Sequence, residues 1–537
     1  MSDVKFSCPG CAQHIAVNEK YAGRQMICPS CKTAMTVPEA PAATPAAART
    51  SIPVPPAPPR SPSRAAGPPA VNGNRKTIAL LIVAVAAVVG GGIGGFVAFK
   101  KGSSDVDQNS TYPSASETPS AEPVKTAPNQ NLPNKPRVAS TAGNSPNPWP
   151  QFRGPNRDGK STETGLLKLW PSDGPPLLWK VTGLGGGYSS VSVADGKVFT
   201  MGDGSGGSQV HAIDENTGRH LWQSRDIGRT GGNREGPKST PAVDLAAGNV
   251  YALGQFGDLV CLKIANGQEV WRKSLTKDFG GKSPKWNYAE SPLLDGDRVL
   301  VSPGGRRGNV VALNKDTGAT IWQSKQYTDE AQYVSMIISP MGLSRHYITM
   351  SMETVAGINA QTGNLLWRIP RKGATAVIPS PLVYKKIVFV TSGYKIGCTA
   401  FQISSKGDRL FTRRLYSNKD LINHHGGVVL VDQYIYGHSD RGGWKCMDIT
   451  TGKLLWEDSG VGKGSVVYAD GHLICRSETG SGKIALIEAT PRGYVEKGRF
   501  AQPERSNNNS WAHPVVANGK LFIRDQDVLL CFDLREG

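Results

Sequence analysis

The chain has 537 residues, of which 38% are hydrophobic and 19% charged, and its formal net charge is +18. Residues 1–101 contribute +8 (11 basic minus 3 acidic) and 102–148 contribute −1 (3 minus 4), which leaves +11 for 149–537. That charge suits an acidic partner, but it is spread over a large domain and gives no reason to expect nucleic acid. The five cysteines after residue 38 include no adjacent pair, which argues against a disulfide framework.

Residues 1–37 contain two Cys-x-x-Cys pairs separated by sixteen residues. Tetrahedral Zn²⁺ takes four thiolates at about 2.3 Å, and each short turn presents two of them. A module this small cannot bury a sufficient core, so metal binding would supply much of its folding free energy. The spacing predicts a zinc ribbon, with two disulfides as the alternative, and the stretch resembles the short zinc-ribbon fingers of bacterial membrane proteins. The expected ligands are Cys8, Cys11, Cys28 and Cys31.

A membrane anchor is expected next. Residues 38–76 are dominated by Pro and Ala and should be disordered. Residues 77–99 are 23 consecutive uncharged residues, long enough to cross a ~30 Å hydrocarbon core as a helix. Because a metal module precedes this span, we expect a single-pass anchor and not a cleaved signal peptide. Residues 100–148, rich in Ser, Thr, Pro and Asn, should form a second flexible linker.

The flanking charges predict the orientation of the anchor. Four basic residues lie shortly before the span and two follow it, which favours a cytoplasmic N-terminus. Thiolate zinc ligands also prefer a reducing compartment. We therefore expect an inner-membrane protein whose residues 1–76 are cytoplasmic and whose residues after 100 lie in the periplasm or outside the cell.

A repeat runs through residues 149–537. Asp214-x-x-Thr217-Gly218 leads to Trp222, and similar segments lead to tryptophans 49, 51, 45 and 89 residues further along in succession. Each unit consists of short apolar runs separated by Asp-Gly, Thr-Gly or similar turns, which are hairpin signals because Gly accepts a positive φ. Four antiparallel strands per roughly 45 residues are typical of a propeller blade. In the fifth unit Phe411 stands in place of the tryptophan, and in the seventh Lys497 does.

The number of blades follows from the starts of the first strands. We count eight such starts, near Ser190, Thr240, Ser291, Val334, Ser380, Gly427, Ser465 and Pro514. The last unit stops at Gly537, where its fourth strand should begin, while an unpaired strand containing Trp179 precedes the first unit. The sequence therefore predicts an all-β, eight-bladed propeller in which the N-terminal strand completes the eighth blade and closes the ring.

The Asp-x-x-Thr-Gly-x-x-x-Trp repeat resembles the tryptophan-docking motif of PQQ-like (quinoprotein-type, BamB-like) propellers over about residues 149–537. The resemblance implies that each tryptophan packs against the neighbouring blade and has a structural role. The tryptophans concerned are Trp179, Trp222, Trp271, Trp322, Trp367 and Trp456.

Candidate binding residues come from propeller geometry. The first strand of a blade is innermost, so the residues just before it converge on one mouth of the central channel. Convergent polar groups in such a funnel form the default binding-site hypothesis. The candidates are Tyr188, Lys238, Glu290, Tyr333, His424, His425, Lys463, Trp511 and His513.

Two functions compete. The BamB-like resemblance implies a non-enzymatic module that binds a protein or polymer of the cell envelope, and we favour it. The alternative is a PQQ-dependent or other envelope oxidoreductase, but such enzymes resemble this chain only in the repeat. They use adjacent cysteines over the quinone, a metal held by Glu and Asn, and an Asp base. Glu290 and Asn287 would suit a metal, yet no two cysteines are adjacent, so PQQ is not expected. Hydrolysis by Glu290 with His424 or His425 is a third possibility.

Overall fold

The computed structural model describes residues 3–7, 14–18, 25–28, 33–36, 147–231, 236–339, 345–406 and 409–536. The chain divides into two compact units, residues 1–125 and 126–537. No helix long and apolar enough to span a membrane occurs within the described ranges. The predicted anchor at 77–99, the linker at 38–76 and all but the last two residues of the linker at 100–148 lie outside them.

The first unit contains two antiparallel hairpins. Strand β1 (Asp3–Ser7) pairs with β2 (His14–Asn18), and β3 (Gln25–Ile27) pairs with β4 (Ala34–Thr36). Each Cys-x-x-Cys pair falls in sequence between the two strands of one hairpin. Of the four cysteines, only Cys28 belongs to the described residues. It is fully buried, and its N–H donates to the carbonyl of Thr33 at 2.9 Å.

The second unit consists of eight antiparallel four-stranded sheets, the blades. Blade 1 comprises β6 (Ser192–Ala194), β7 (Lys197–Asp203), β8 (Ser208–Asp214) and β9 (His220–Gln223), and blade 2 comprises β10 (Ala242–Asp244), β11 (Asn249–Leu253), β12 (Asp258–Lys263) and β13 (Glu269–Ser274). Blade 3 comprises β14 (Leu293–Asp295), β15 (Arg298–Val301), β16 (Val311–Asn314) and β17 (Thr320–Gln323), and blade 4 comprises β18 (Ile337–Ser339), β19 (His346–Met350), β20 (Thr354–Asn359) and β21 (Leu365–Pro370).

Blades 5 to 8 follow the same order, except that the last strand of blade 8 comes from the start of the unit. Blade 5 comprises β22 (Leu382–Tyr384), β23 (Ile387–Ser392), β24 (Gly397–Lys406) and β25 (Arg409–Asn418), and blade 6 comprises β26 (Val428–Val431), β27 (Tyr434–Ser439), β28 (Gly443–Asp448) and β29 (Leu454–Asp458). Blade 7 comprises β30 (Gly464–Ala469), β31 (His472–Ser477), β32 (Ile484–Glu488) and β33 (Glu496–Phe500), and blade 8 comprises β34 (Val515–Ala517), β35 (Lys520–Asp525), β36 (Val528–Asp533) and β5 (Leu177–Val181).

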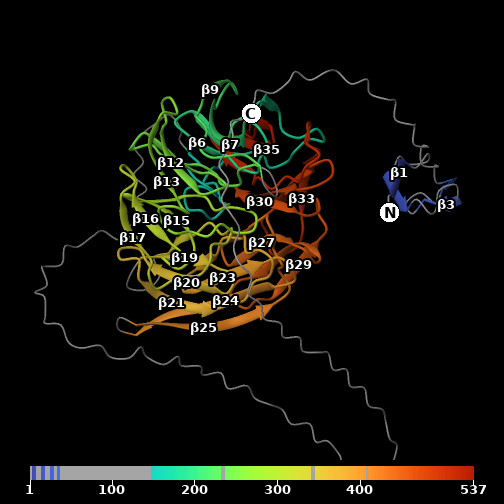
Figure 1. Ribbon diagram of the computed structural model, residues 1–537. Coiled ribbons are helices and arrows are strands. Elements are labelled where there is room, and N and C mark those ends of the chain that lie inside the picture. Colours follow the sequence, from blue (N-terminus) through green and yellow to red (C-terminus); the bar gives the residue numbers. More distant parts are fainter. Residues whose placement is uncertain are drawn as a thin grey trace, which may run out of the picture. The chain divides into compact units, whose positions relative to one another are not determined.

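The blades follow one another around a ring in chain order, so that the last lies beside the first (Figure 1). The predicted eight-bladed propeller is confirmed, and so is its closure, because β5 pairs with β36 and places Trp179 opposite Cys531. A buried ion pair crosses the seam between blades 8 and 1, with Lys520 Nζ at 2.9 Å from Glu215 Oε1. Both ends of the ring thus meet in one sheet, which leaves no gap where blades could separate.

The repeated Asp-x-x-Thr-Gly segment forms a turn that its own side chain stabilises. Asp214 Oδ1 accepts hydrogen bonds from the backbone N–H groups of Asn216 (3.0 Å) and Thr217 (2.9 Å) and from the Thr217 hydroxyl (2.9 Å). Asn314 makes the same contacts in blade 3. Gly218 follows at φ 72°, where only glycine avoids a steric penalty. The recurring residues are those that this turn requires.

Four of the repeat tryptophans lie against the glycine of the next blade's turn. Ring atoms of Trp179, Trp222, Trp271 and Trp322 come within 3.0 Å of the position that a Cβ would take at Gly218, Gly267, Gly318 and Gly363, respectively. The indole N–H of Trp456 donates to the Thr490 carbonyl of blade 7 at 2.8 Å. Trp367 is 5% exposed and packs with Phe401 and Ile403 of blade 5. All six tryptophans therefore lie between consecutive blades.

Blade 5 contradicts the assignment of Phe411 to the tryptophan position. Its two outer strands are ten residues long, and β25 places Tyr416 opposite Ala400, the register that tryptophan has in other blades. The Tyr416 hydroxyl donates to the Ile449 carbonyl at 2.8 Å, and its ring lies against Gly452. Phe411 is 49% exposed. The assignment is wrong because the long hairpin moves the aromatic residue five positions along the strand.

Blade 7 has no aromatic side chain at this position, which Gly498 occupies opposite Leu486, one residue beyond the expected Lys497. Trp170, from the segment before the first blade, takes the space beside it. The Trp170 Cβ lies 2.8 Å from where a Cβ of Gly498 would stand, and the Trp170 N–H donates to the Lys497 carbonyl at 2.8 Å. Its ring packs edge-on against Phe500, with 5.6 Å between centroids.

Substituting Gly363 with alanine should destabilise the interface of blades 3 and 4. The new Cβ would meet the Trp322 ring at 2.5 Å, at a φ of +74°, so we expect a loss of about 2 to 4 kcal/mol in the free energy of unfolding. Urea denaturation measures it. Gly296→Ala is the matched control, because Gly296 has a similar φ of +63° and nothing within 4 Å. Equal losses for both variants would contradict this packing role.

A segment that no repeat pattern predicted crosses the inside of the ring. We call residues 149–161 the plug. Trp149 exchanges two backbone hydrogen bonds of 2.8 Å with Val193, and the Arg157 guanidinium donates to three carbonyls at 2.8 to 3.0 Å. The hydrogen-bond partners of the plug lie on six blades: Val193 (blade 1), Val243 (2), Ser291 and Pro292 (3), Met336 (4), Val428 (6) and Tyr468 (7). The plug thereby blocks the central channel.

Candidate functional site: the funnel

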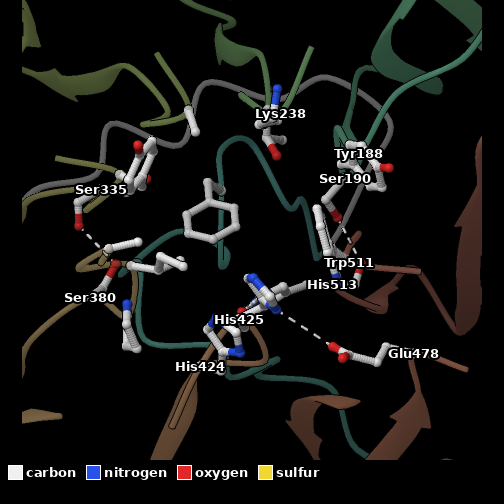
Figure 2. Close-up of a pocket in the computed structure, with 18 of the residues that line it drawn as sticks. Tyr188, Ser190, Lys238, Ser335, Ser380, His424, His425, Glu478, Trp511 and His513 are labelled. Carbon is white, nitrogen blue, oxygen red and sulfur yellow. Dashed lines mark hydrogen bonds and ion pairs between the residues drawn. The ribbon is translucent and has the colours of Figure 1, made fainter. Parts of the chain in front are cut away.

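A cavity of about 340 Å³, which we call the funnel, lies where the innermost strands begin. Because every blade contributes the residues that precede its first strand, side chains far apart in sequence meet there (Figure 2). One lining residue from each blade in turn is Tyr188, Lys238, Ala289, Tyr333, Pro379, His425, Lys463 and His513.

The structure brings together eight of the nine candidate binding residues. Those that line the funnel are Tyr188, Lys238, Tyr333, His424, His425, Lys463, Trp511 and His513. Glu290 does not line it: the side chain is 1% exposed, and its Oε1 accepts the Ser302 backbone N–H. Burial raises the pKa of Glu290 to about 7, against the opposing effects of the Ser302 hydrogen bonds and the Arg157 cation. A ligand-binding role for the eight stays a prediction.

Five rings form a continuous stack along the funnel, which we call the aromatic wall. Tyr188 stacks on Trp511 with 4.6 Å between centroids, Trp511 on His425 at 4.4 Å, and His425 on His424 at 3.7 Å. Tyr394 meets His424 edge-on, with 4.4 Å between centroids. Rings held in contact keep a fixed orientation, and such a surface favours flat or apolar groups.

A charged cluster lies beside the two stacked histidines. Lys463 Nζ is 2.6 Å from His424 Nδ1, 3.0 Å from Asp440 Oδ1 and 3.7 Å from Glu478 Oε1. Glu478 Oε2 is 3.6 Å from His425 Nδ1. Burial opposes ionisation of Glu478, but the nearby His425 and the cation of Lys463 outweigh it, so its pKa is lowered. The two carboxylates of this cluster share one lysine.

The plug supplies two residues of the funnel, Phe152 and Arg153. The Phe152 ring contacts His513 with 5.2 Å between centroids. Arg153 is 4% exposed, and its Nη2 donates to the carbonyls of Asp158 (2.9 Å) and Val428 (2.5 Å). Burial lowers the pKa of Arg153 to about 10, which still leaves it charged at neutral pH. The funnel is thus a blind pocket with a cation at its closed end.

Buried histidines should make the propeller acid-sensitive. Burial lowers the pKa of His211 and His438 to about 4 and that of His424 and His513 to about 3. As the pH falls below 6.5, these histidines bind protons in the unfolded chain but stay neutral in the native state. The free energy of unfolding that they contribute above pH 6.5 is therefore lost between pH 6.5 and about 3. Each histidine contributes up to about 1.4 kcal/mol per pH unit. Urea midpoints between pH 7 and 4 measure the slope.

His211 offers the sharpest control for this acid sensitivity. Its ring nitrogens are buried with no hydrogen-bond partner among the described residues, so His211→Phe removes a titrating group without breaking such a bond. We expect the slope of the free energy of unfolding against pH to decrease in the variant by the contribution of about one proton. An unchanged slope would contradict the assignment of a neutral, buried His211.

Sequence reasoning missed the funnel residues that do not precede a first strand. Tyr394 and Glu478 follow the second strands of blades 5 and 7, and Trp286 lies four residues before Glu290. The turns after second strands reach the same mouth, so polar and aromatic residues there were the available signal. A sequence signal was also available for Phe152 and Arg153. They belong to a Trp-Pro-Gln-Phe-Arg-Gly-Pro segment that lies outside the repeat and that the repeat does not explain.

The comparisons with known proteins agree with this geometry. A family model described as outer membrane protein assembly factor BamB matches residues 206–458. The propeller is BamB-like. BamB of Burkholderia pseudomallei is 23% identical over 393 residues, covering 69% of this chain and 91% of that protein. BamB of Escherichia coli is 25% identical over 341 residues, covering 53% of this chain and 81% of that protein.

A solved structure extends the likeness to the quinoprotein group at the level of fold alone. The quinohemoprotein alcohol dehydrogenase of Comamonas testosteroni superposes with a TM-score of 0.52 at 12% sequence identity. The match covers 73% of this chain and 81% of that chain. Likeness at this identity says nothing about chemistry.

The funnel does not fit the PQQ site that the quinoprotein resemblance implies. No two cysteines are adjacent in the 537-residue sequence. Glu290, the candidate metal ligand, already binds the Ser302 N–H and does not line the funnel. Within the ranges that the structure describes, no group of three or more His, Cys, Asp or Glu side chains is placed to hold a metal ion. Three of the four proposed zinc ligands, Cys8, Cys11 and Cys31, lie outside those ranges.

Proposed function

We propose that this protein is a membrane-anchored, non-enzymatic binding module of the bacterial cell envelope, whose propeller docks a protein partner at the funnel. The observation that carries the proposal is similarity to BamB proteins over 91% and 81% of their lengths, together with a closed ring that presents the aromatic wall at one mouth. Those relatives are named outer membrane protein assembly factors. Proteins that assemble the outer membrane are therefore the proposed class of partner.

The rest of the chain supports a tethered arrangement. The 23 uncharged residues at 77–99 are proposed as a single inner-membrane anchor with a cytoplasmic N-terminus. Residues 102–148, 47 in number, would reach up to about 145 Å if fully extended at about 3.1 Å per residue. Such a tether lets the propeller meet a partner far from its own membrane.

Residues 1–37 are proposed to bind one Zn²⁺ through Cys8, Cys11, Cys28 and Cys31 and to engage a cytoplasmic partner. The support is that each Cys-x-x-Cys pair falls between two paired strands, as a pair of knuckles on a four-thiolate site requires. Burial of Cys28 agrees with such a site.

The proposed zinc site predicts one metal ion per chain. Full-length protein purified in detergent under reducing conditions should carry one Zn²⁺ by atomic emission, and Cys28→Ser should remove it because three thiolates leave the tetrahedron incomplete. Cys398→Ala, a buried propeller thiol, is the control and should keep the metal. Substoichiometric zinc in the wild type would contradict the site.

Two experiments on the full-length chain test the function of the propeller. Cross-linking in native cells, followed by purification and mass spectrometry, should yield outer-membrane assembly proteins. Titration with PQQ and Ca²⁺, monitored by quinone absorbance and by dye reduction with alcohols or sugars, should yield no turnover. Tight reconstitution with turnover would overturn the proposal in favour of an oxidoreductase.

A further inference from the structure

The closed end of the funnel holds a cation without an acidic partner. Among the described residues, no carboxylate lies within ion-pair distance of Arg153, and Asp158 acts on it only from further away. Two of its atoms, Nε and Nη1, are buried without a hydrogen-bond partner in the described part of the chain. A buried guanidinium normally satisfies its five N–H groups. These two donors therefore call for an acceptor that the propeller itself does not supply.

The surroundings of Arg153 leave room for its guanidinium beside the cavity. Gly427, which also lines the funnel, has no side chain where the guanidinium passes: a Cβ there would meet Arg153 Nη1. The other cations are already engaged. Lys463 is shared by Asp440 and Glu478, while Lys238 donates to the Gly236 carbonyl at 3.2 Å and interacts with Asp203.

We propose that the closed end of the funnel binds a carboxylate on Arg153, with the flat or apolar part of the same ligand against the aromatic wall. A carboxylate offers two acceptors in one plane, which matches a guanidinium fork, and such pairs are among the strongest in proteins. A cavity of about 340 Å³ suits a group the size of a small aromatic acid or of two side chains of a partner's loop. The site does not depend on the envelope partner proposed above.

Glu478 does not prevent carboxylate binding, because its charge is already compensated. It lies 3.6 Å from His425 Nδ1 and 3.7 Å from Lys463 Nζ. Water is the competing occupant of the Arg153 site, since ordered water commonly satisfies buried donors. The two cases can be told apart by measurement, because only a carboxylate-binding site discriminates between a carboxylate and its neutral amide.

The test compares phenylacetate with phenylacetamide, which share a shape and differ in charge, by calorimetric titration of the full-length protein. Wild type should bind phenylacetate at least tenfold more tightly. Arg153→Gln should abolish this ratio and Arg153→Lys should keep part of it, so a folding defect in one variant leaves the other readable. Trp511→Phe should weaken both compounds and leave their ratio unchanged. Equal affinities in the wild type would overturn the proposal in favour of water, and a ratio that survives in Arg153→Gln would overturn it in favour of another cation.

A second pair of probes identifies the source of the carboxylate. N-acetyl-Glu-Phe-amide and N-acetyl-Gln-Phe-amide present the same contrast on a peptide backbone. Discrimination between them supports an acidic loop of a protein partner, whereas discrimination only between the phenylacetate pair supports a small organic acid. Both results depend on Arg153. Detection of PQQ turnover, or failure to find the envelope partner, would not alter either one, so this inference and the proposed function fail separately.

Discussion

Trp179→Ala is expected to lower the free energy of unfolding by about 3 to 5 kcal/mol, because a large buried side chain is lost at the seam of the ring. Trp179 is 8% exposed, its indole N–H donates to the Glu215 carbonyl at 3.0 Å, and its ring lies against Gly218 of blade 1. It therefore joins blade 8, where its strand pairs, to blade 1. Urea denaturation followed by tryptophan fluorescence measures the loss.

Leu178→Ala is the matched control for Trp179→Ala. Leu178 neighbours Trp179 on the same strand, is 40% exposed, and should change stability by less than about 1 kcal/mol. Hydrogen exchange adds a second readout, since opening of the seam should expose the amides of β36 in the tryptophan variant alone. Similar losses for both variants would mean that Trp179 does not hold the ring closed.

Arg157→Met is expected to cost about 3 to 5 kcal/mol, because it removes the donors of several buried hydrogen bonds and leaves their acceptors unpaired. Arg157 is 3% exposed and donates to the carbonyls of Ser291, Pro292 and Met336. Its loss also removes the cation that opposes the raised pKa of Glu290, so Glu290 should become a weaker acid still. Methionine keeps most of the volume, so the effect reports hydrogen bonding.

The exposed Arg409 of β25 provides the comparison for Arg157, and Arg409→Met should stay within about 0.5 kcal/mol of wild type. In Arg157→Met, amides of the plug should also exchange faster with solvent than those of the blades. A variant as stable as wild type, with a protected plug, would show that the plug is not held by this guanidinium.

Most of the ring was predictable from sequence because its repeat encodes local chemistry. An Asp or Asn that caps a turn, a Gly at positive φ and a Trp that packs on the next glycine each leave a residue-level signal. The register of blade 5 was not predictable, because ten-residue strands shift Tyr416 relative to the Thr-Gly spacing. Gly498 in blade 7 is compensated by Trp170, whose position depends on tertiary contacts alone.

The candidate site was predictable only where it follows blade geometry. Residues before first strands reach the funnel, and eight of nine candidates line it. Glu290 fails this rule because side chains of an extended segment alternate in direction, so Ala289 faces the funnel and Glu290 the interior. Phe152 and Arg153 escaped prediction because the plug belongs to no repeat. Its path is set by hydrogen bonds to blades that are distant in sequence.

Position-specific photo-cross-linking in native cells tests most directly whether the funnel is the docking surface. A benzophenone amino acid replaces Tyr188 or Tyr394 at the funnel, and Ile321 or Val270 on the exposed outer strands of blades 3 and 2. Adducts with an outer-membrane assembly protein at the two funnel positions, and none at the outer strands, are the predicted result. Adducts at Ile321 or Val270 with none at Tyr188 and Tyr394 would contradict the account.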